Sequence, residues 1–180
     1  MELECPIIIT NSGIHYFRIL ILRKVRNQTL AVLKAEFEGC NIVDIGANIG
    51  DTTLNLAAAA GGEATVAAFE VGPSLDLLKL NIRQNPQFKI NVHEVAVSDK
   101  FGTISFGHNG NNGGVTLNTN SSLKQSFRHQ SEVKSVKLYQ YLQEQYPPEF
   151  IDNICFIKID TEGHDITILK VITRLKRKLL

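Results

Sequence analysis

Residues 43–53, which read VDIGANIGDTT, constrain the fold of this chain more than any other segment. An apolar run over 42–45 leads into a loop of small residues over 46–50, and a helix pattern begins at Asp51. A strand, a tight glycine loop and a helix N-terminus in this order allow backbone N–H groups to approach a nucleotide-like ligand. The segment therefore predicts a ligand site. A tight turn without a ligand is the alternative.

Glu70 ends the next strand-like run, 64–69. It follows Gly46 at about the spacing, roughly 20 residues, that brings an acidic side chain to ribose hydroxyls in such folds. A dinucleotide site is excluded because Asn48 and Asp51 stand at the second and third glycine positions of G-x-G-x-x-G. A P-loop is excluded because the chain has no Gly-Lys pair.

A second group of polar side chains follows the strand-like run 154–159. Asp160, Glu162, His164 and Asp165 are four titratable residues within a short segment. Open α/β sheets bind ligands at the carboxyl ends of their strands. Clusters of titratable groups are also typical of functional sites. The segment therefore predicts the second half of the same site.

Together these segments resemble the FkbM family of S-adenosylmethionine-dependent methyltransferases. The matching pieces lie in the family's order over roughly residues 40–170: 43–53, 69–70, 80–81, 96–99, 112–117 and 158–169. The resemblance implies an α/β fold, a Rossmann-like class I methyltransferase sheet with helices on both faces. It also implies S-adenosylmethionine as cofactor and O-methylation of a sugar or secondary metabolite.

The residues expected to bind this cofactor follow three successive strands: Asp44, Gly46, Asn48, Gly50, Glu70, Ser98 and Asp99. Gly46 and Gly50 would let the backbone pass close to the methionine moiety, although turn geometry alone also explains them. Asp44 would receive the cofactor's amino group or cap the turn. The two oxygens of Glu70 match two vicinal ribose hydroxyls. Ser98 and Asp99 would contact the adenine edge or form an ordinary turn.

Methyl transfer from a sulfonium needs little acid assistance, whereas an alcohol nucleophile gains from a general base. His164, with an ordinary pKa near neutrality, is the expected base. Asp160 is expected to orient either this base or the substrate hydroxyl, and Glu162 to bind substrate. The carboxylates could instead hold a divalent cation, but we assign no metal ligand.

The apolar pattern predicts two parts of the chain. Amphipathic helices over 14–38 suggest a helical extension at residues 1–40, and strand–helix alternation suggests a methyltransferase domain over 41–180. The predicted elements of this domain are strands 41–45, 64–70, 90–97, 101–106, 133–138 and 154–160, and helices 51–60, 74–85 and 165–178, with a short helix before Pro147. Residues 107–126, rich in Gly, Asn and Ser, predict a mobile lid, which has no core residue over 107–114 and only Val115 and Leu117 as early anchors.

Composition limits the partners. The formal net charge of +1 gives no reason to expect nucleic acid, so a small-molecule or glycan acceptor is expected.

Cys40 and Cys155 adjoin apolar runs and predict small core residues in a reducing compartment. The apolar pieces 7–9 and 19–22 are too short for a signal peptide or a membrane span. We therefore expect no membrane partner and a cytoplasmic location. The oligomeric state is left open.

The chain departs from the family pattern at three places. Val71 separates Glu70 from the usual proline, Tyr139 replaces an aspartate, and Val171–Ile172 replaces Gly-Ala. The chain also ends after the helix that follows the fourth strand, so we expect a truncated sheet with an exposed edge beside 154–160. A catalytically inactive, truncated relative that binds S-adenosylmethionine is therefore the alternative to an active enzyme.

Overall fold

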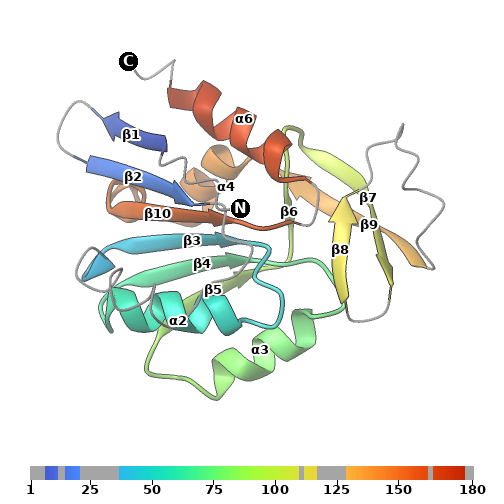
Figure 1. Ribbon diagram of the computed structural model, residues 1–180, viewed down its shortest axis with the longest axis horizontal. Helices are drawn as coiled ribbons and strands as arrows, with labels where there is room; N and C mark the ends of the chain where they lie inside the picture. Colours follow the sequence, from blue (N-terminus) through green and yellow to red (C-terminus); the bar gives the residue numbers. More distant parts are fainter. Residues whose placement is uncertain are drawn as a thin grey trace, which may run out of the picture.

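A computed structural model describes residues 7–11, 15–20, 37–109, 112–116, 129–161 and 164–176. A six-stranded main sheet has the order β1-β2-β10-β3-β4-β5 (Figure 1). The strands are β1 Ile7–Asn11, β2 His15–Leu20, β10 Ile154–Ile159, β3 Asn41–Ile45, β4 Thr65–Phe69 and β5 Lys89–His93. Every neighbouring pair is parallel except β1 and β2.

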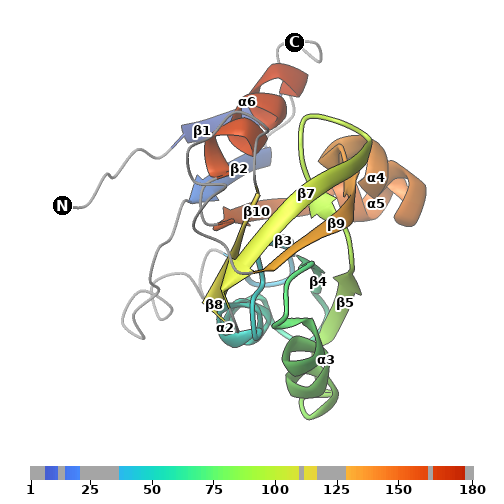
Figure 2. The ribbon, with the colours of Figure 1, turned by 90° about the vertical axis from the view of Figure 1, so that its right-hand side faces the viewer.

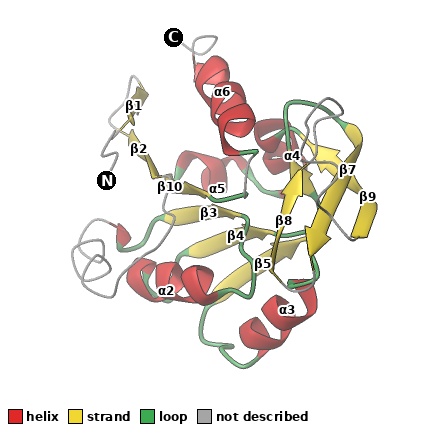
Figure 3. Ribbon diagram, turned by 45° about the vertical axis from the view of Figure 1, so that its right-hand side comes forward, coloured by secondary structure: helices red, strands yellow, loops and turns green. Residues whose placement is uncertain are grey.

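Helices cover both faces of this sheet (Figure 3). They are α2 Asp51–Ala60 and α3 Leu75–Arg83 on one face, and α4 Leu138–Gln145, α5 Pro148–Asp152 and α6 Asp165–Lys176 on the other. Alternate residues of β3 point to opposite faces of the sheet. Ile42 packs against the apolar residues of α2, which form the α2 cluster, whereas Val43 and Ile45 pack with α4, α5 and α6. The predicted fold, a Rossmann-like α/β sheet with helices on both faces, is confirmed.

The predicted strand 90–97 is two strands in the structure. β5 ends at His93, and β6, Ala96–Val97, belongs to a second sheet of order β6-β9-β7-β8. The other strands of this sheet are β7 Gly102–Asn109, β8 Asn112–Thr116 and β9 His129–Val136. It lies across the carboxyl ends of the parallel strands (Figure 2). An apolar run does not reveal which partner each half of it pairs with, so the sequence could not separate β5 from β6.

The lid expected over residues 107–126 is wrong where the structure describes it. Residues 107–109 extend β7 and residues 112–116 form β8, while 110–111 and 117–128 lie outside the described residues. β7 pairs with β9 from Gly102 to His108. Backbone hydrogen bonds to a distant strand therefore order a segment whose Gly and Asn content suggests a loop.

The helix expected over 14–38 is wrong at its start, because His15–Leu20 is strand β2. Residues 21–36 lie outside the described part. β2 pairs with β10 in parallel, from Phe156↔Arg18 to Lys158↔Leu20. The edge of β10 that the sequence suggested would be exposed is therefore covered. A short apolar run is compatible with helix or strand, and the free edge of β10 decides between them.

Cys40 and Cys155 form a disulfide between the beginnings of β3 and β10. Both also pack against the α2 cluster, so they are core residues as expected, but cross-linked ones. Disulfides persist in oxidising compartments, whereas the cysteine pattern suggested a reducing one. Separately, no helix within the described ranges is long and apolar enough to cross a membrane.

Reduction of this disulfide is expected to lower the free energy of unfolding by about 2–4 kcal/mol, because the cross-link restricts the unfolded chain. Urea unfolding with and without a reductant measures the difference. The matched control is the Cys40→Ala/Cys155→Ala variant, whose unfolding should not respond to the reductant. Alkylation of both cysteines in unreduced, unfolded protein would contradict the cross-link.

Candidate functional site

The loop between β3 and α2 begins with a close contact between two backbone segments. Gly46 has φ +79°, and a Cβ on it would lie 1.9 Å from the Asp160 carbonyl oxygen. The N–H groups of Gly46 and Ala47 both donate to the Phe69 carbonyl, at 3.0 and 3.1 Å. Asn48 follows with φ +52°, a left-handed conformation that is uncommon without glycine. Glycine is therefore required at position 46 so that the loop can lie against the end of β10.

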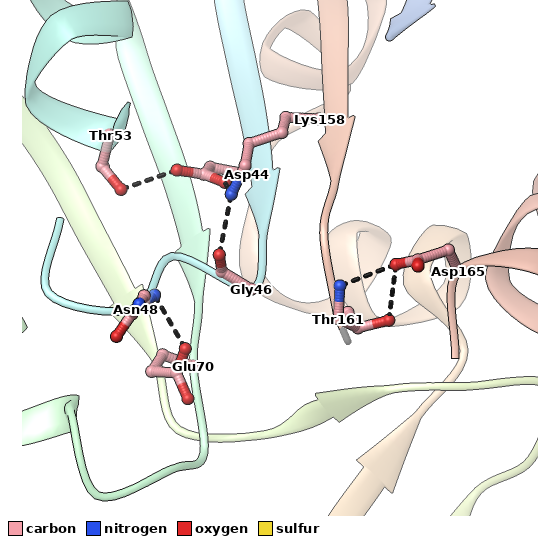
Figure 4. Close-up of polar contacts among 8 residues, drawn as sticks. All are labelled: Asp44, Gly46, Asn48, Thr53, Glu70, Lys158, Thr161 and Asp165. Atoms are coloured by element: carbon pink, nitrogen blue, oxygen red, sulfur yellow. Dashed lines mark hydrogen bonds and ion pairs between the residues drawn. The ribbon is translucent and has the colours of Figure 1, made fainter. Parts of the chain in front are cut away.

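Glu70 lies at the end of β4 beside this loop, as expected. Its Oε2 accepts a hydrogen bond from the Asn48 N–H at 2.8 Å (Figure 4). Its Oε1 accepts from the N–H groups of Val71 and Gly72, at 2.8 and 2.5 Å. One half-buried carboxylate thus joins the glycine loop to the turn that follows β4.

Asp44 is fully buried, and partners within the chain bond both of its oxygens. Oδ1 accepts from Lys158 Nζ at 2.8 Å, and Oδ2 accepts from Thr53 Oγ1 at 2.6 Å (Figure 4). Lys158 Nζ also donates to the Gly46 carbonyl at 2.7 Å. Sequence reasoning missed Lys158 and Thr53. The available signal was a lysine inside the apolar run ICFIKI, since a charge in a buried strand requires a partner.

Asp160 directly follows β10, and its N–H donates to the Ile45 carbonyl at 2.9 Å. The side chain is half-buried. The next residue, Thr161, donates through its N–H and Oγ1 to Asp165 Oδ1, at 2.6 and 2.8 Å, near the start of α6 (Figure 4). Glu162, expected to bind substrate, lies outside the described residues. Asp160 is therefore beside the glycine loop, as the parallel-strand argument predicted.

His164 is 7% exposed, and its Nε2 lies 3.0 Å from Ser98 Oγ. Ser98 Oγ also donates to Asp99 Oδ1 at 3.2 Å. Burial lowers the pKa of His164, although the carboxylates of Asp99 and Asp165 act in the opposite direction. The imidazole is therefore neutral near pH 7 and able to accept a proton. The structure thus brings His164, the expected base, into contact with Ser98, which with Asp99 was expected to contact the adenine edge. The sequence did not reveal this contact.

The second sheet packs against the turn that carries Glu70. A Cβ on Gly72 would lie 3.3 Å from the Phe106 ring of β7. On the same strand, the His108 ring centre is 6.1 Å from that of Phe106 and 5.2 Å from that of His129, its cross-strand partner. The sequence gave these two histidines no role. They form a row with Phe106 in the sheet that borders the candidate site.

A metal centre is not formed by the residues that the structure describes, since no three His, Cys, Asp or Glu side chains among them are placed to hold an ion. Because Glu162 lies outside this set, the carboxylate group after β10 is described only in part.

His93, at the end of β5, is a half-buried imidazole. Its ring stacks on Phe69 with centres 4.7 Å apart, and its Nε2 lies 2.7 Å from the Tyr146 hydroxyl. Its Nδ1 lies 3.3 Å from the Tyr141 hydroxyl. Burial lowers the pKa of His93 and raises the pKa of Tyr146 to about 12.

Comparison with known proteins gives one family. The sequence model of the methyltransferase FkbM domain matches residues 44–179, more than half of the chain. No curated protein matches the sequence significantly.

Three solved structures resemble parts of the chain. A proposed rRNA methylase from Clostridium thermocellum is 18% identical, with a TM-score of 0.35, over 43% of this chain and 45% of that one. A precorrin-6y C5,15-methyltransferase from Geobacter metallireducens is 16% identical, with a TM-score of 0.33, over 42% of this chain and 43% of that one. A protein-L-isoaspartate O-methyltransferase is 13% identical, with a TM-score of 0.33, over 48% of this chain and 27% of that one. The match spans less than half the length of each of these proteins.

Stability is expected to fall as the pH drops below about 6.5, the ordinary imidazole pKa. Burial lowers the pKa of His93 and His164 in the folded chain, so the unfolded chain takes up these protons at a higher pH. The unfolded state then binds more protons, so the free energy of unfolding decreases. Melting temperatures between pH 7.5 and 5 measure the decline. His93→Gln should make it shallower, and the exposed His129→Gln serves as control. Identical slopes in all three proteins would contradict the assignment to His93.

Proposed function

Because the chain belongs to the FkbM methyltransferase family, we propose that it transfers the methyl group of S-adenosylmethionine to a hydroxyl of a sugar or secondary metabolite. The observation that carries this proposal is the Glu70–Asn48 hydrogen bond of 2.8 Å. It holds an acidic side chain against the glycine loop at the carboxyl ends of β3 and β4. A ribose and its attached methionine moiety would lie at these two features.

The loop fits a cofactor without phosphate. The loop passes so close to Asp160 that a Cβ at Gly46 would clash, and Asp51 opens α2 at the position where a pyrophosphate would need positive potential. A carboxylate oxygen accepts two hydrogen bonds. Within the described residues, Asn48 is the partner recorded for Glu70 Oε2, so this oxygen has the capacity to accept a ribose hydroxyl.

The acceptor side lies after β10. When bound, S-adenosylmethionine would supply the methyl group carried by its sulfonium sulfur. The rest of the cofactor would leave as a neutral thioether. The acceptor hydroxyl loses its proton as its oxygen gains the methyl group. We assign this proton to neutral His164 by way of Ser98. The Ser98 hydroxyl, 3.0 Å from Nε2, would turn from Asp99 to donate its own proton to Nε2 and take up the proton of the acceptor. Asp160 would orient the hydroxyl, and Glu162 would contact the rest of the acceptor.

A non-catalytic binder of S-adenosylmethionine is the second candidate. It is favoured by the burial of His164, whose Nε2 already has Ser98 as a partner. The two candidates differ in one measurement, the transfer of a labelled methyl group to a panel of sugar and polyketide hydroxyls. Cofactor binding without transfer to any acceptor would support the second.

Glu70→Gln is expected to weaken binding of S-adenosylhomocysteine about 10- to 100-fold, because a charge-assisted hydrogen bond to ribose becomes a neutral one. Titration calorimetry measures this. Glu63→Gln is the matched control, since its carboxylate is exposed and paired with Lys89. If the folded parent binds neither S-adenosylmethionine nor S-adenosylhomocysteine, the proposed function is rejected.

His164→Gln is expected to lower kcat at least about 100-fold, because an amide can hydrogen-bond Ser98 but cannot accept the proton. The dissociation constant for S-adenosylhomocysteine should change little. Labelled methyl transfer with any acceptor found in the panel gives the comparison. Full activity in the variant would remove His164 from the role of base.

A further inference from the structure

Lys158 and Asp44 form an ion pair deep inside the sheet. Their side chains are 4% and 0% exposed, whereas the other ion pairs between described residues lie at the surface. β10 is otherwise apolar, with the sequence ICFIKI. Replacing a buried ion pair by apolar residues is often neutral or stabilising. Fold stability alone therefore does not account for a lysine at this position.

The second hydrogen bond of Lys158 suggests its role. Nζ donates to the Gly46 carbonyl at 2.7 Å, and the N–H of the same peptide unit, that of Ala47, donates to the Phe69 carbonyl at 3.1 Å. One peptide unit is thus held at its oxygen by β10 and at its nitrogen by β4. It leads directly into the left-handed Asn48, whose N–H reaches Glu70.

We propose that Lys158 is a positioning residue for the cofactor. Its ammonium fixes the Gly46–Ala47 peptide and with it the loop that would receive the methionine and ribose moieties of S-adenosylmethionine. The cofactor part of this inference rests on the proposed function. Asp44 then serves mainly to balance the buried charge, with Thr53 bonded to its other oxygen.

The same lysine relates the two halves of the site. It lies two residues before Asp160, whose carbonyl oxygen is in contact with Gly46. Loss of the hydrogen bond from Lys158 to Gly46 would therefore change the position of the cofactor loop relative to Asp160 on the acceptor side. An apolar residue would fill the space without holding the carbonyl.

The test is the double variant Asp44→Asn/Lys158→Met, which removes both charges together and so avoids an unpaired buried carboxylate. We expect a cooperatively folded protein with a melting temperature near that of the parent. Its affinity for S-adenosylhomocysteine should fall at least tenfold, and amide hydrogen exchange over residues 46–50 should become faster. Lys89→Met, which removes an exposed ion pair with Glu63, is the matched control and should leave both measurements unchanged.

A second variant, Lys158→Arg, keeps a cation beside Asp44 but replaces the single Nζ donor by a planar fork. It is expected to fold and to lose affinity, and it provides the test if the double variant does not fold. Parent-like affinity together with parent-like exchange over 46–50, in either folded variant, would overturn the proposal. If the parent binds no cofactor, the proposed function fails, and the exchange rates alone then decide whether Lys158 holds the loop.

Discussion

The contact between the backbones of Gly46 and Asp160 is the constraint on which the site depends. β3 and β10 are neighbours in the sheet, and a side chain at position 46 would coincide with the Asp160 carbonyl. Because this contact is so close, the loop that follows β3 and the segment that follows β10 meet at one edge. Glu70 from β4 and Lys158 from β10 then bond the loop from two sides. The arrangement requires parallel strands in this order, since only then do the three carboxyl ends lie together.

The sequence predicted the features that local patterns encode. The glycine loop, β3, α2, β4 and the position of Glu70 follow from apolar spacing and turn residues within about 30 positions. The features that were missed depend on distant partners. Lys158 meets Asp44 across 114 residues, Ser98 meets His164 across 66, and the disulfide joins cysteines separated by 115. β2 and β8 likewise become strands because a neighbouring strand offers hydrogen bonds, not because of their own composition.

The site is built from groups that already have partners. The carboxylates of Asp44 and Glu70 accept hydrogen bonds from the chain itself, and His164 contacts Ser98. Such bonds fix orientation before a ligand arrives, so less conformational entropy is lost when it binds. They also restrict which atoms remain to recognise the ligand. Glu70 Oε2 is a group on the cofactor side that combines a fixed position with bonding capacity, whereas the N–H groups of Gly46, Ala47 and Gly50 already donate within the chain.

The pairing of β2 with β10 has a consequence for how the protein is made. Residues near Arg18 leave the ribosome well before their partners near Phe156. During translation, at about 5–20 residues per second, the first hairpin has no strand to join, and the growing sheet retains an open edge at β3. Contacts of such long range close slowly and expose unpaired strands in the meantime. The edge of β3 on this side therefore stays unpaired until β10 has been made.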